Sequence, residues 1–255
     1  MKAKERIISD LVAKIENSTE SWVKSWIPLY PENIRGTGYS GMNFVNLLFS
    51  GGASHKWLTF KQAVQAGHKV KKGAKGQYIV YASKKENKQG EEYYFLKGYF
   101  VFNLSDMEGY TPEEQIFSLS ECKAFTDKFK SLYIQENLAE CYYSPFHHKI
   151  NVPPVTQFKS EQAYFSVLFH ELAHSTKAAL PRAYDYATEE LIAELCAFFL
   201  CVKFGIAEEV KSNTVAYLKG WLKKNPPAVL YDAAKEASKA FDYLVNFETK
   251  VELPA

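Results

Sequence analysis

The sequence contains few cysteines and no apolar run long enough to cross a membrane. Only four of its 255 residues are cysteine and none forms a C-x-x-C pair, which indicates reduced, buried thiols and not a disulfide framework. The longest apolar stretch, residues 191–202, is interrupted by Glu194 and is too short for a bilayer span. Residues 1–9 lack the apolar core of a signal peptide. We therefore expect a cytoplasmic protein with no membrane partner.

Charge is nearly balanced over the whole chain but not along it. The formal net charge is +2, yet residues 1–110 carry 16 basic and 10 acidic side chains, and residues 111–255 carry 15 and 19. This asymmetry predicts two halves with different partners, and a basic half can face a polyanion. Scattered solubilising lysines are the alternative interpretation of so small an imbalance. Since 47% of the residues are apolar or aromatic, the chain can bury a sizeable core.

The first half shows the periodicities of a small α+β domain. Ile7, Leu11 and Ile15 recur at helical spacing, and the capping box from Thr59 to Gln62 begins a short helix. We expect helices at residues 4–17, 43–49 and 60–66, and strands at residues 77–83 and 92–102.

The second half is mostly helical. An interdomain linker is expected within residues 106–115, which contain Gly109 and Pro112. The prediction is thus an α+β protein with domains at residues 1–108 and 109–255. Helices are expected at residues 119–133, 160–176, 187–204, 208–223 and 228–247, with a short extended segment at residues 149–152.

The strongest functional signal is the motif His170-Glu-Leu-Ala-His174. Histidines four residues apart share one face of a helix, so both imidazoles can bind one metal ion. Glu171 flanks the same site and can take a proton from a metal-bound water. A chance pair of helical histidines is the competing interpretation, but the apolar residues before the motif favour a partly buried site. We predict Zn²⁺ and hydrolysis of a protein or peptide substrate.

A catalytic zinc needs a third protein ligand and one open position. The segment Thr188-Glu-Glu-Leu-Ile-Ala-Glu194, at the start of the next expected helix, offers three acids. Glu190 and Glu194 share a helical face, so we assign Glu190 as the ligand and Glu194 as an acid that orients a ligand histidine. Glu189 is the alternative ligand, although it can also serve only to cap the helix.

Four further residues near the motif are weaker candidates. His147 and His148 precede an expected strand, where adjacent side chains point to opposite faces, so we interpret them as exposed polar residues. Tyr184 or Tyr186 could donate a phenol to the transition state, although tyrosines in such a connection more often serve in packing.

A basic stretch lies in the first half. Between Lys56 and Lys88 there are nine lysines and one acid, with Trp57, Tyr78 and Tyr81 interleaved. Lysines neutralise phosphates and aromatic rings stack on any base, so the pattern favours single-stranded nucleic acid. A solvated lysine-rich face over buried aromatics is the alternative interpretation.

Two blocks of residues resemble a known family. The first half is similar to the N-terminal domain of ArdC-like antirestriction proteins, and the second half to their zincin-like peptidase domain. Together the matches span most of residues 22–205, in the family's order. The matching residues are Trp26…Pro31-Glu-Asn33…Thr37-Gly-Tyr39-Ser-Gly41-Met-Asn43…Leu47-Leu48…Trp57-Leu-Thr59-Phe-Lys-Gln62-Ala63…Gly67…Val70-Lys-Lys-Gly73-Ala-Lys-Gly76 and then Phe158-Lys-Ser160…Tyr164…His170-Glu-Leu-Ala-His174…Tyr186-Ala-Thr-Glu-Glu190-Leu-Ile-Ala-Glu194-Leu.

The resemblance implies a single-stranded-DNA-binding domain joined to a zinc metallopeptidase-like domain. It also implies carriage by a conjugative plasmid or another mobile element and protection of incoming DNA from restriction. The implied metal ligands are His170, His174 and a Glu within residues 189–194, in agreement with the assignment from spacing. The residues that the resemblance carries over as DNA-binding are Trp26, Asn33, Tyr39, Asn43, Trp57, Lys71, Lys72 and Lys75.

The chain departs from the family's pattern at three points. The segment between Asn33 and Tyr39 is slightly shorter than the family usually has. His148 stands where the family tends to have Asp, and Ser175 stands where the family commonly has Trp. These departures concern the substrate groove and the partner. Two other functions remain open: a non-enzymatic DNA-masking protein with a structural metal, and a regulator-cleaving peptidase similar to ImmA/IrrE-type enzymes.

Overall fold

The computed structural model describes residues 2–18, 30–87, 89–112, 119–136 and 139–248, and these fall into two compact units. Unit 1 comprises residues 1–115 and 215–232, and unit 2 comprises residues 116–214 and 233–255. Both units combine helices with a sheet, which confirms the predicted α+β class. The domain boundary between residues 108 and 109 stays a prediction. Across the described segments, no helix has the length and apolar content that crossing a bilayer requires.

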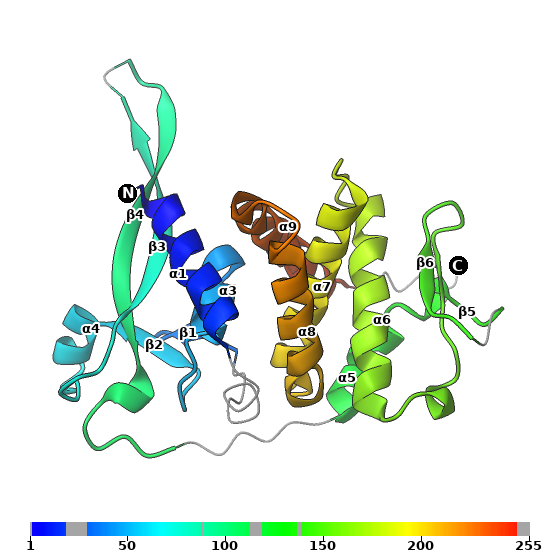
Figure 1. Ribbon diagram of the computed structural model, residues 1–255, viewed down its shortest axis with the longest axis horizontal. Coiled ribbons are helices and arrows are strands. Elements are labelled where there is room, and N and C mark those ends of the chain that lie inside the picture. The colour runs from blue at the N-terminus through cyan, green and yellow to red at the C-terminus, as the bar shows by residue number, and fades with distance from the viewer. Residues whose placement is uncertain (1, 19–29, 88, 113–118, 137–138, 249–255) are drawn as a thin grey trace, which may run out of the picture. The chain divides into compact units, whose positions relative to one another are not determined.

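Unit 1 is built around a four-stranded sheet (Figure 1). Its strands follow the order β1-β2-β4-β3, with β1 parallel to β2 and the other neighbours antiparallel. The elements of this unit are α1 (Ala3–Asn17), β1 (Glu32–Asn33), α3 (Gly41–Leu48), β2 (Lys56–Thr59), α4 (Phe60–Gln65), β3 (Gln77–Glu86), β4 (Glu92–Asn103) and the 3-10 turn η1 (Leu104–Asp106).

The local signals in the first half hold in the structure. Ile7, Leu11 and Ile15 are fully buried along one face of α1. The capping box of α4 is formed, because the Gln62 N–H donates to Thr59 Oγ1 at 3.2 Å and the Thr59 N–H donates to Gln62 Oε1 at 2.8 Å. Strands β3 and β4 run slightly further than predicted and make the long hairpin in Figure 1.

Helix α3 occupies the free edge of the sheet at β3. The Val80 N–H donates to Asn43 Oδ1 at 2.8 Å, and Asn43 Nδ2 donates to the Val80 carbonyl at 2.6 Å. One turn along, Asn46 Nδ2 donates to the Tyr78 carbonyl at 2.8 Å. A sheet edge presents unpaired backbone groups that must be satisfied or covered. Two asparagines three residues apart on α3 therefore bond to backbone groups of Tyr78 and Val80 at the β3 edge and fix the helix to it.

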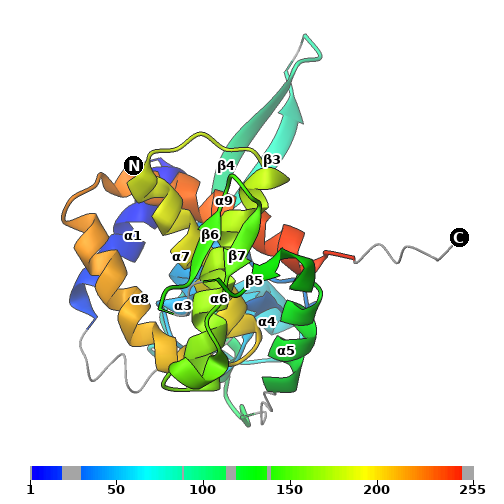
Figure 2. The same cartoon turned by 90° about the vertical axis from the view of Figure 1, so that its right-hand side faces the viewer.

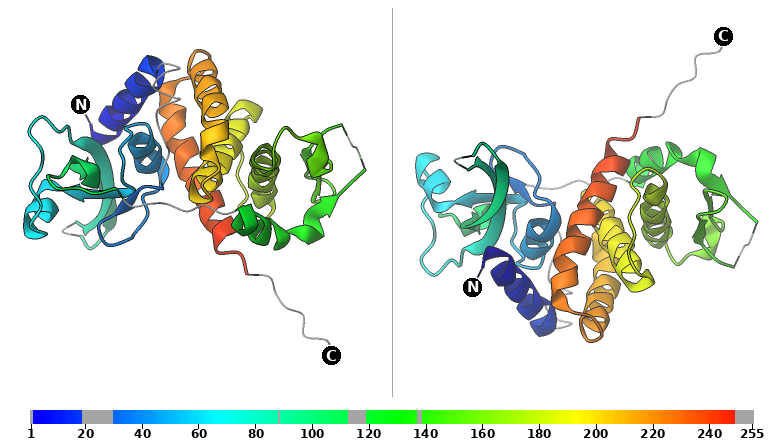
Figure 3. Two further views of the ribbon diagram at one scale, coloured as in Figure 1. Left: turned by 90° about the horizontal axis from the view of Figure 1, so that it is seen from below. Right: turned by 90° about the horizontal axis from the view of Figure 1, so that it is seen from above.

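Unit 2 is organised around helix α6 (Glu161–Ser175), which packs against α7 (Tyr186–Lys203) on one side and a small sheet on the other (Figures 1, 2 and 3). The sheet has the order β5-β7-β6, with β5 parallel and β6 antiparallel to the central strand. Helices α8 (Ala207–Leu222) and α9 (Pro227–Val245) contribute residues to both units. The remaining elements are α5 (Leu119–Asp127), η2 (Lys130–Leu132), β5 (Tyr133–Ile134), β6 (Tyr142–Ser144), β7 (Lys149–Asn151), η3 (Val155–Gln157) and η4 (Thr176–Ala178).

The predicted elements differ from the structure at the short strands, since β1 and β2 of unit 1 were not predicted and neither were β5 and β6 of the small sheet. The helix expected at residues 119–133 ends at Asp127, and Tyr133 instead begins strand β5 opposite Ile150. The Tyr133 hydroxyl donates to the Thr126 carbonyl at 2.8 Å and ties the new strand back to the end of α5. Strands of two and three residues carry almost no sequence periodicity, and their pairing with β7 overrides local helical preference.

The bridge between Asn43 and Val80 predicts a stability effect. Asn43→Ala leaves a backbone N–H and a C=O of the buried Val80 without partners, so we expect it to lower the free energy of unfolding by about 2–4 kcal/mol. Urea denaturation followed by circular dichroism measures the change. Asn17→Ala is the matched control, because the exposed Asn17 side chain only donates to Ala13 at the end of α1. Equal midpoints for the two variants would contradict the role given to Asn43.

Candidate metal centre

Helices α6 and α7 each begin at a side-chain cap. Ser160 Oγ accepts the Ala163 N–H at 3.0 Å at the start of α6, and Asp185 Oδ1 accepts the Thr188 N–H at 2.7 Å at the start of α7. These caps satisfy backbone donors that the first helical turn leaves unpaired. They also fix the residue at which each helix begins.

The side chains of His170, His174 and Glu190 converge on one point. The two Nε2 atoms are 3.1 Å apart, and each lies 3.4 Å from an oxygen of the Glu190 carboxylate. One donor atom from each residue lies within 4.8 Å of the other two. Two imidazole nitrogens and one carboxylate form the protein donor set of a catalytic zinc site with an acidic third ligand. The three residues therefore fit a single divalent ion.

The other ring nitrogens of both histidines face the two neighbouring acids. His174 Nδ1 lies 3.2 Å from Glu189 Oε1, and His170 Nδ1 lies 3.7 Å from Glu194 Oε2. A proton held on Nδ1 by such a carboxylate leaves Nε2 unprotonated and directed at the metal position. The geometry thus separates the three acids, with Glu190 between the Nε2 atoms and the other two behind the rings.

The acids around the histidines favour positive charge at this position. Burial lowers the pKa of His170, but hydrogen bonds with Glu190 and Glu194 outweigh it and raise that pKa to about 10. The same contact with His170 lowers the pKa of Glu190. A divalent cation supplies such a charge, so the electrostatics agree with the donor set.

Glu171 lies in the same cleft and is held by the small sheet. Its side chain is buried, which raises the pKa of this carboxyl, and its Oε2 accepts the Tyr143 N–H of β6 at 2.7 Å. The cleft has a volume of about 410 Å³. Tyr186 lines the cleft beside Glu190, whereas Tyr184 is not among the lining residues. Tyr186 is therefore the better placed of the two predicted phenols.

The adjacent histidines lie apart from this set. His147 and His148 are both exposed in the turn between β6 and β7, and His148 Nδ1 bonds with the Tyr143 hydroxyl at 2.9 Å. Neither residue belongs to the group of potential metal ligands among the described residues. Their interpretation as exposed polar residues agrees with the structure.

Arg182 bonds to the acid behind His174, and it was not singled out from the sequence. Its side chain is 3% exposed, and it donates to Glu189 through Nε at 2.9 Å and through Nη2 at 2.8 Å. It also donates to the carbonyl of Ala173 and to Thr176 Oγ1, which anchors it to the end of α6. An arginine after a proline in an interhelical loop has no spacing that would mark it. Only the fold shows that Arg182 holds the acid behind His174.

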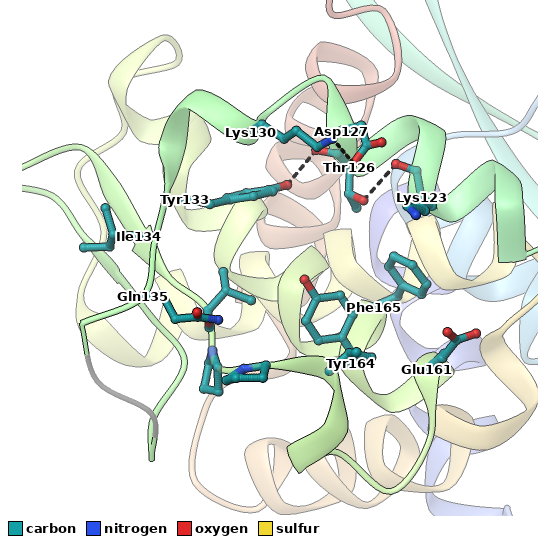
Figure 4. Close-up of a pocket in the computed structure, with 14 residues that line it drawn as sticks. Lys123, Thr126, Asp127, Lys130, Tyr133, Ile134, Gln135, Glu161, Tyr164 and Phe165 are labelled. Carbon is teal, nitrogen blue, oxygen red and sulfur yellow. Dashed lines mark hydrogen bonds and ion pairs between the residues drawn. The ribbon is translucent and has the colours of Figure 1, made fainter.

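A larger cavity of about 530 Å³ lies elsewhere in unit 2 (Figure 4). Tyr133, Tyr164 and Phe165 form its aromatic wall, with charged side chains such as Lys123 and Glu161 around them. Burial raises the pKa of Tyr133 and of Tyr164. None of the residues predicted for metal binding lines this cavity. The larger cavity is therefore not the one into which the potential metal ligands converge.

The aromatic and amide residues carried over as DNA-binding have structural contacts in unit 1. Trp57 is 4% exposed and packs in the core, with Tyr39 against the same cluster. Asn43 bridges to β3, and Asn33 Oδ1 accepts the N–H groups of Arg35 and Thr37 in a turn. A buried ring cannot stack on a base, so Trp57 offers no stacking surface in this structure. DNA binding by the partly buried Asn33, Tyr39 and Asn43 stays a prediction.

The lysines of that set differ, because Lys71, Lys72 and Lys75 are all exposed. They lie in the loop between α4 and β3, where Gly73 adopts a positive φ of 90°. Lys71 Nζ donates to the Ser105 carbonyl at 2.8 Å. Trp26 lies outside the described residues.

Comparisons with known proteins agree with both units. Residues 1–116 match the N-terminal domain of anti-restriction factor ArdC, and residues 120–236 match a zincin-like metallopeptidase. The Mn(II)-bound crystal structure of antirestriction ArdC from plasmid R388 is 31% identical, with a TM-score of 0.75 over 96% of this chain and 99% of that one. The chain belongs to the ArdC family.

This ArdC-family chain is also similar to other proteins. The metal-free structure of the R388 protein is 29% identical with a TM-score of 0.73, over 96% of this chain and 98% of that chain. DNA primase TraC of Escherichia coli is 28% identical over 96% of this chain but only 27% of the primase. Protein y4eC of Sinorhizobium fredii is 24% identical over 94% of this chain and 90% of that protein. The chain thus spans about a quarter of the curated primase that it matches.

The contact between Arg182 and Glu189 predicts an effect on metal affinity. Arg182→Met removes the bidentate partner of Glu189 and frees His174 to turn, so we expect metal binding to weaken about 10- to 100-fold. Competition with a chromophoric chelator measures this, and His170→Ala gives the reference for complete loss. Lys177→Met is the matched control, because Lys177 also approaches Glu189, at 4.0 Å, but is 39% exposed. Equal effects of Arg182→Met and Lys177→Met would refute the positioning role.

Proposed function

We propose that this ArdC-family chain is an antirestriction protein of a plasmid or other mobile element, acting in the cytoplasm. It binds single-stranded DNA through unit 1 and hydrolyses a protein or peptide substrate at a zinc site in unit 2. The relatives support the first part, since the R388 protein is named an antirestriction protein. The convergence of His170, His174 and Glu190 beside the buried Glu171 supports the second.

The proposed metal ligands are His170 Nε2, His174 Nε2 and the Glu190 carboxylate, with Glu194 and Glu189 orienting the histidines. Bound Zn²⁺ would supply a Lewis acid that polarises the scissile carbonyl and lowers the pKa of an attacking water. Mn²⁺ is a further test ion, because the R388 relative is described with Mn(II).

Glu171 is the proposed general base. Because Tyr143 holds one carboxylate oxygen, the other remains to accept the proton of the attacking water. Raised by burial, the pKa of Glu171 lies closer to neutral pH than that of an exposed glutamate, which suits both accepting a proton and passing it to the leaving amine. Tyr186 at the mouth of the cleft is the proposed phenol donor to the transition state.

A Glu171→Gln variant tests the peptidase. The glutamine keeps an oxygen for the Tyr143 N–H but cannot take up a proton, so we expect hydrolysis to fall at least about 10²-fold while metal content is unchanged. Cleavage of a peptide library, analysed by mass spectrometry beside elemental metal analysis, measures both. Wild-type cleavage by the variant would exclude Glu171 as the base.

The same variant separates the proposed function from the alternatives. If protection of DNA from restriction persists in Glu171→Gln at the wild-type level, the chain acts as a DNA-masking protein with a structural metal. If protection is lost together with hydrolysis, proteolysis is part of the mechanism. Identification of a transcriptional regulator as the cleaved protein would favour the regulator-cleaving peptidase.

Binding to single-stranded DNA through the loop lysines gives a separate test. We expect the double substitution Lys71→Ala/Lys72→Ala to weaken binding. The slope of the logarithm of the binding constant against the logarithm of the salt concentration should become shallower by about 0.7 for each phosphate that the variant no longer neutralises. Fluorescence anisotropy of a labelled oligothymidylate over a range of salt concentrations measures it. Lys61→Ala on helix α4 is an exposed-lysine control. Wild-type affinity and salt slope in the double variant would exclude the loop from the interface.

A further inference from the structure

The outer part of the β3–β4 hairpin carries an open aromatic face. In the register of this antiparallel pair, four successive cross-strand pairs share one side: Ile79–Tyr99, Tyr81–Lys97, Ser83–Phe95 and Lys85–Tyr93. Directly opposed residues project to the same side of a sheet, and successive pairs of this set are two residues apart. Each pair contributes one aromatic ring, so the rings form a ladder with a spacing of roughly 7 Å along the strands.

The rings of this ladder are accessible to a ligand. Tyr81 is 62% exposed, Tyr93 47% and Tyr99 37%, and Phe95 is half-buried. Beyond the buried Ile79 at its base, the face has no aliphatic side chain that could anchor an apolar protein partner. Three exposed tyrosines and a phenylalanine in a row instead offer flat surfaces for stacking.

Charge is divided between the two sides of the hairpin. Lys85 lies 4.9 Å from the centre of the Phe95 ring, and Lys97 lies 5.2 Å from that of Tyr99, so both ammonium groups sit among the rings. The acids within the two strands, Glu86 and Glu92, pair with each other across the hairpin and project to the opposite side. Glu92 there forms an ion pair with Lys84. The aromatic side is therefore cationic and free of strand carboxylates.

We propose that this aromatic face, defined by Tyr81, Lys85, Tyr93, Phe95, Lys97 and Tyr99, is the surface on which unit 1 stacks the bases of single-stranded DNA. The inference rests on the proposed DNA binding and assigns it to residues that sequence comparison did not select. Rings stack on any base, and the lysines between them reach the phosphates. Bases inside a duplex are already stacked on their neighbours, so the face discriminates in favour of single strands.

Tyrosine substitutions in the full-length chain test the stacking. Loss of a stacked ring weakens single-strand binding by about 5- to 150-fold, so we expect at least a fivefold loss for Tyr81→Ala/Tyr93→Ala in anisotropy with a labelled oligothymidylate. Tyr81→Phe/Tyr93→Phe keeps the rings and retains affinity. Phe60→Ala is the control for an exposed ring outside the face, since Phe60 is 59% exposed on α4. Thermal melting of each variant verifies that it is folded.

The adjacent lysines 84 and 85 form a matched pair, because they project from opposite sides of the same strand. Lys85→Ala should weaken binding and make the slope of the logarithm of the binding constant against the logarithm of the salt concentration shallower by about 0.7. Lys84→Ala should leave the binding constant and this slope unchanged. Wild-type affinity in the folded alanine double variant, or equal effects of the two lysines, would overturn the proposal. So would a loss of self-association without a loss of DNA affinity, because the face would then be a contact between copies of this chain.

The outcomes also separate this inference from the proposed function. If the wild-type chain binds oligothymidylate and only the Lys71→Ala/Lys72→Ala variant loses affinity, the aromatic face is refuted and DNA binding stands. If the wild-type chain binds no single-stranded DNA, the DNA-binding part of the proposed function fails together with the aromatic face. A loss in the tyrosine-to-alanine and Lys85→Ala variants, with wild-type affinity in the Lys84→Ala, Phe60→Ala and tyrosine-to-phenylalanine variants, supports the assignment.

Discussion

The packing of α6 against α7 is the constraint on which the candidate metal centre depends. Helix α7 is buried along most of its length, so each acid in its first half must find a partner inside the protein. Glu190 finds both Nε2 atoms, Glu194 finds His170 Nδ1 and Thr214, and Glu189 finds His174. The same contacts satisfy the buried Glu189 and the half-buried Glu190 and Glu194 and orient the two imidazoles.

Four carboxylates lie close together at this site: those of Glu171, Glu189, Glu190 and Glu194. Their negative charges repel one another, which raises the pKa of each and disfavours the ionised state. Arg182 offsets part of this repulsion at Glu189, and the histidines offset it at Glu190. A divalent cation would offset the remainder. The arrangement thus links the stability of this part of unit 2 to the charge at the candidate metal position. It also explains why the buried Arg182 lies behind His174, although a guanidinium group offers a metal no donor atom.

Unit 1 distributes its aromatic residues in two ways that composition cannot distinguish. Trp57 lies in the core with the partly buried Tyr39 packed against it, while the rings of the outer hairpin project from the sheet. The difference follows from the two-residue alternation of a strand and from where α3 ends its cover of β3. Composition records how many rings the unit has, and strand register decides which of them are exposed.

The sequence alone determined the elements with strong periodicity or caps, the α+β class and the family. It also selected Glu190 and Glu194, since helical spacing places both on the face that α6 meets. Tertiary structure decided what spacing cannot express: the short strands β5 and β6, which exist only through pairing; the place of Glu189 behind His174; and the burial of Arg182. It also decided that Trp57 lies in the core and that Asn43 bonds to a sheet edge. Local sequence records which groups can share a face, but only packing determines what that face meets.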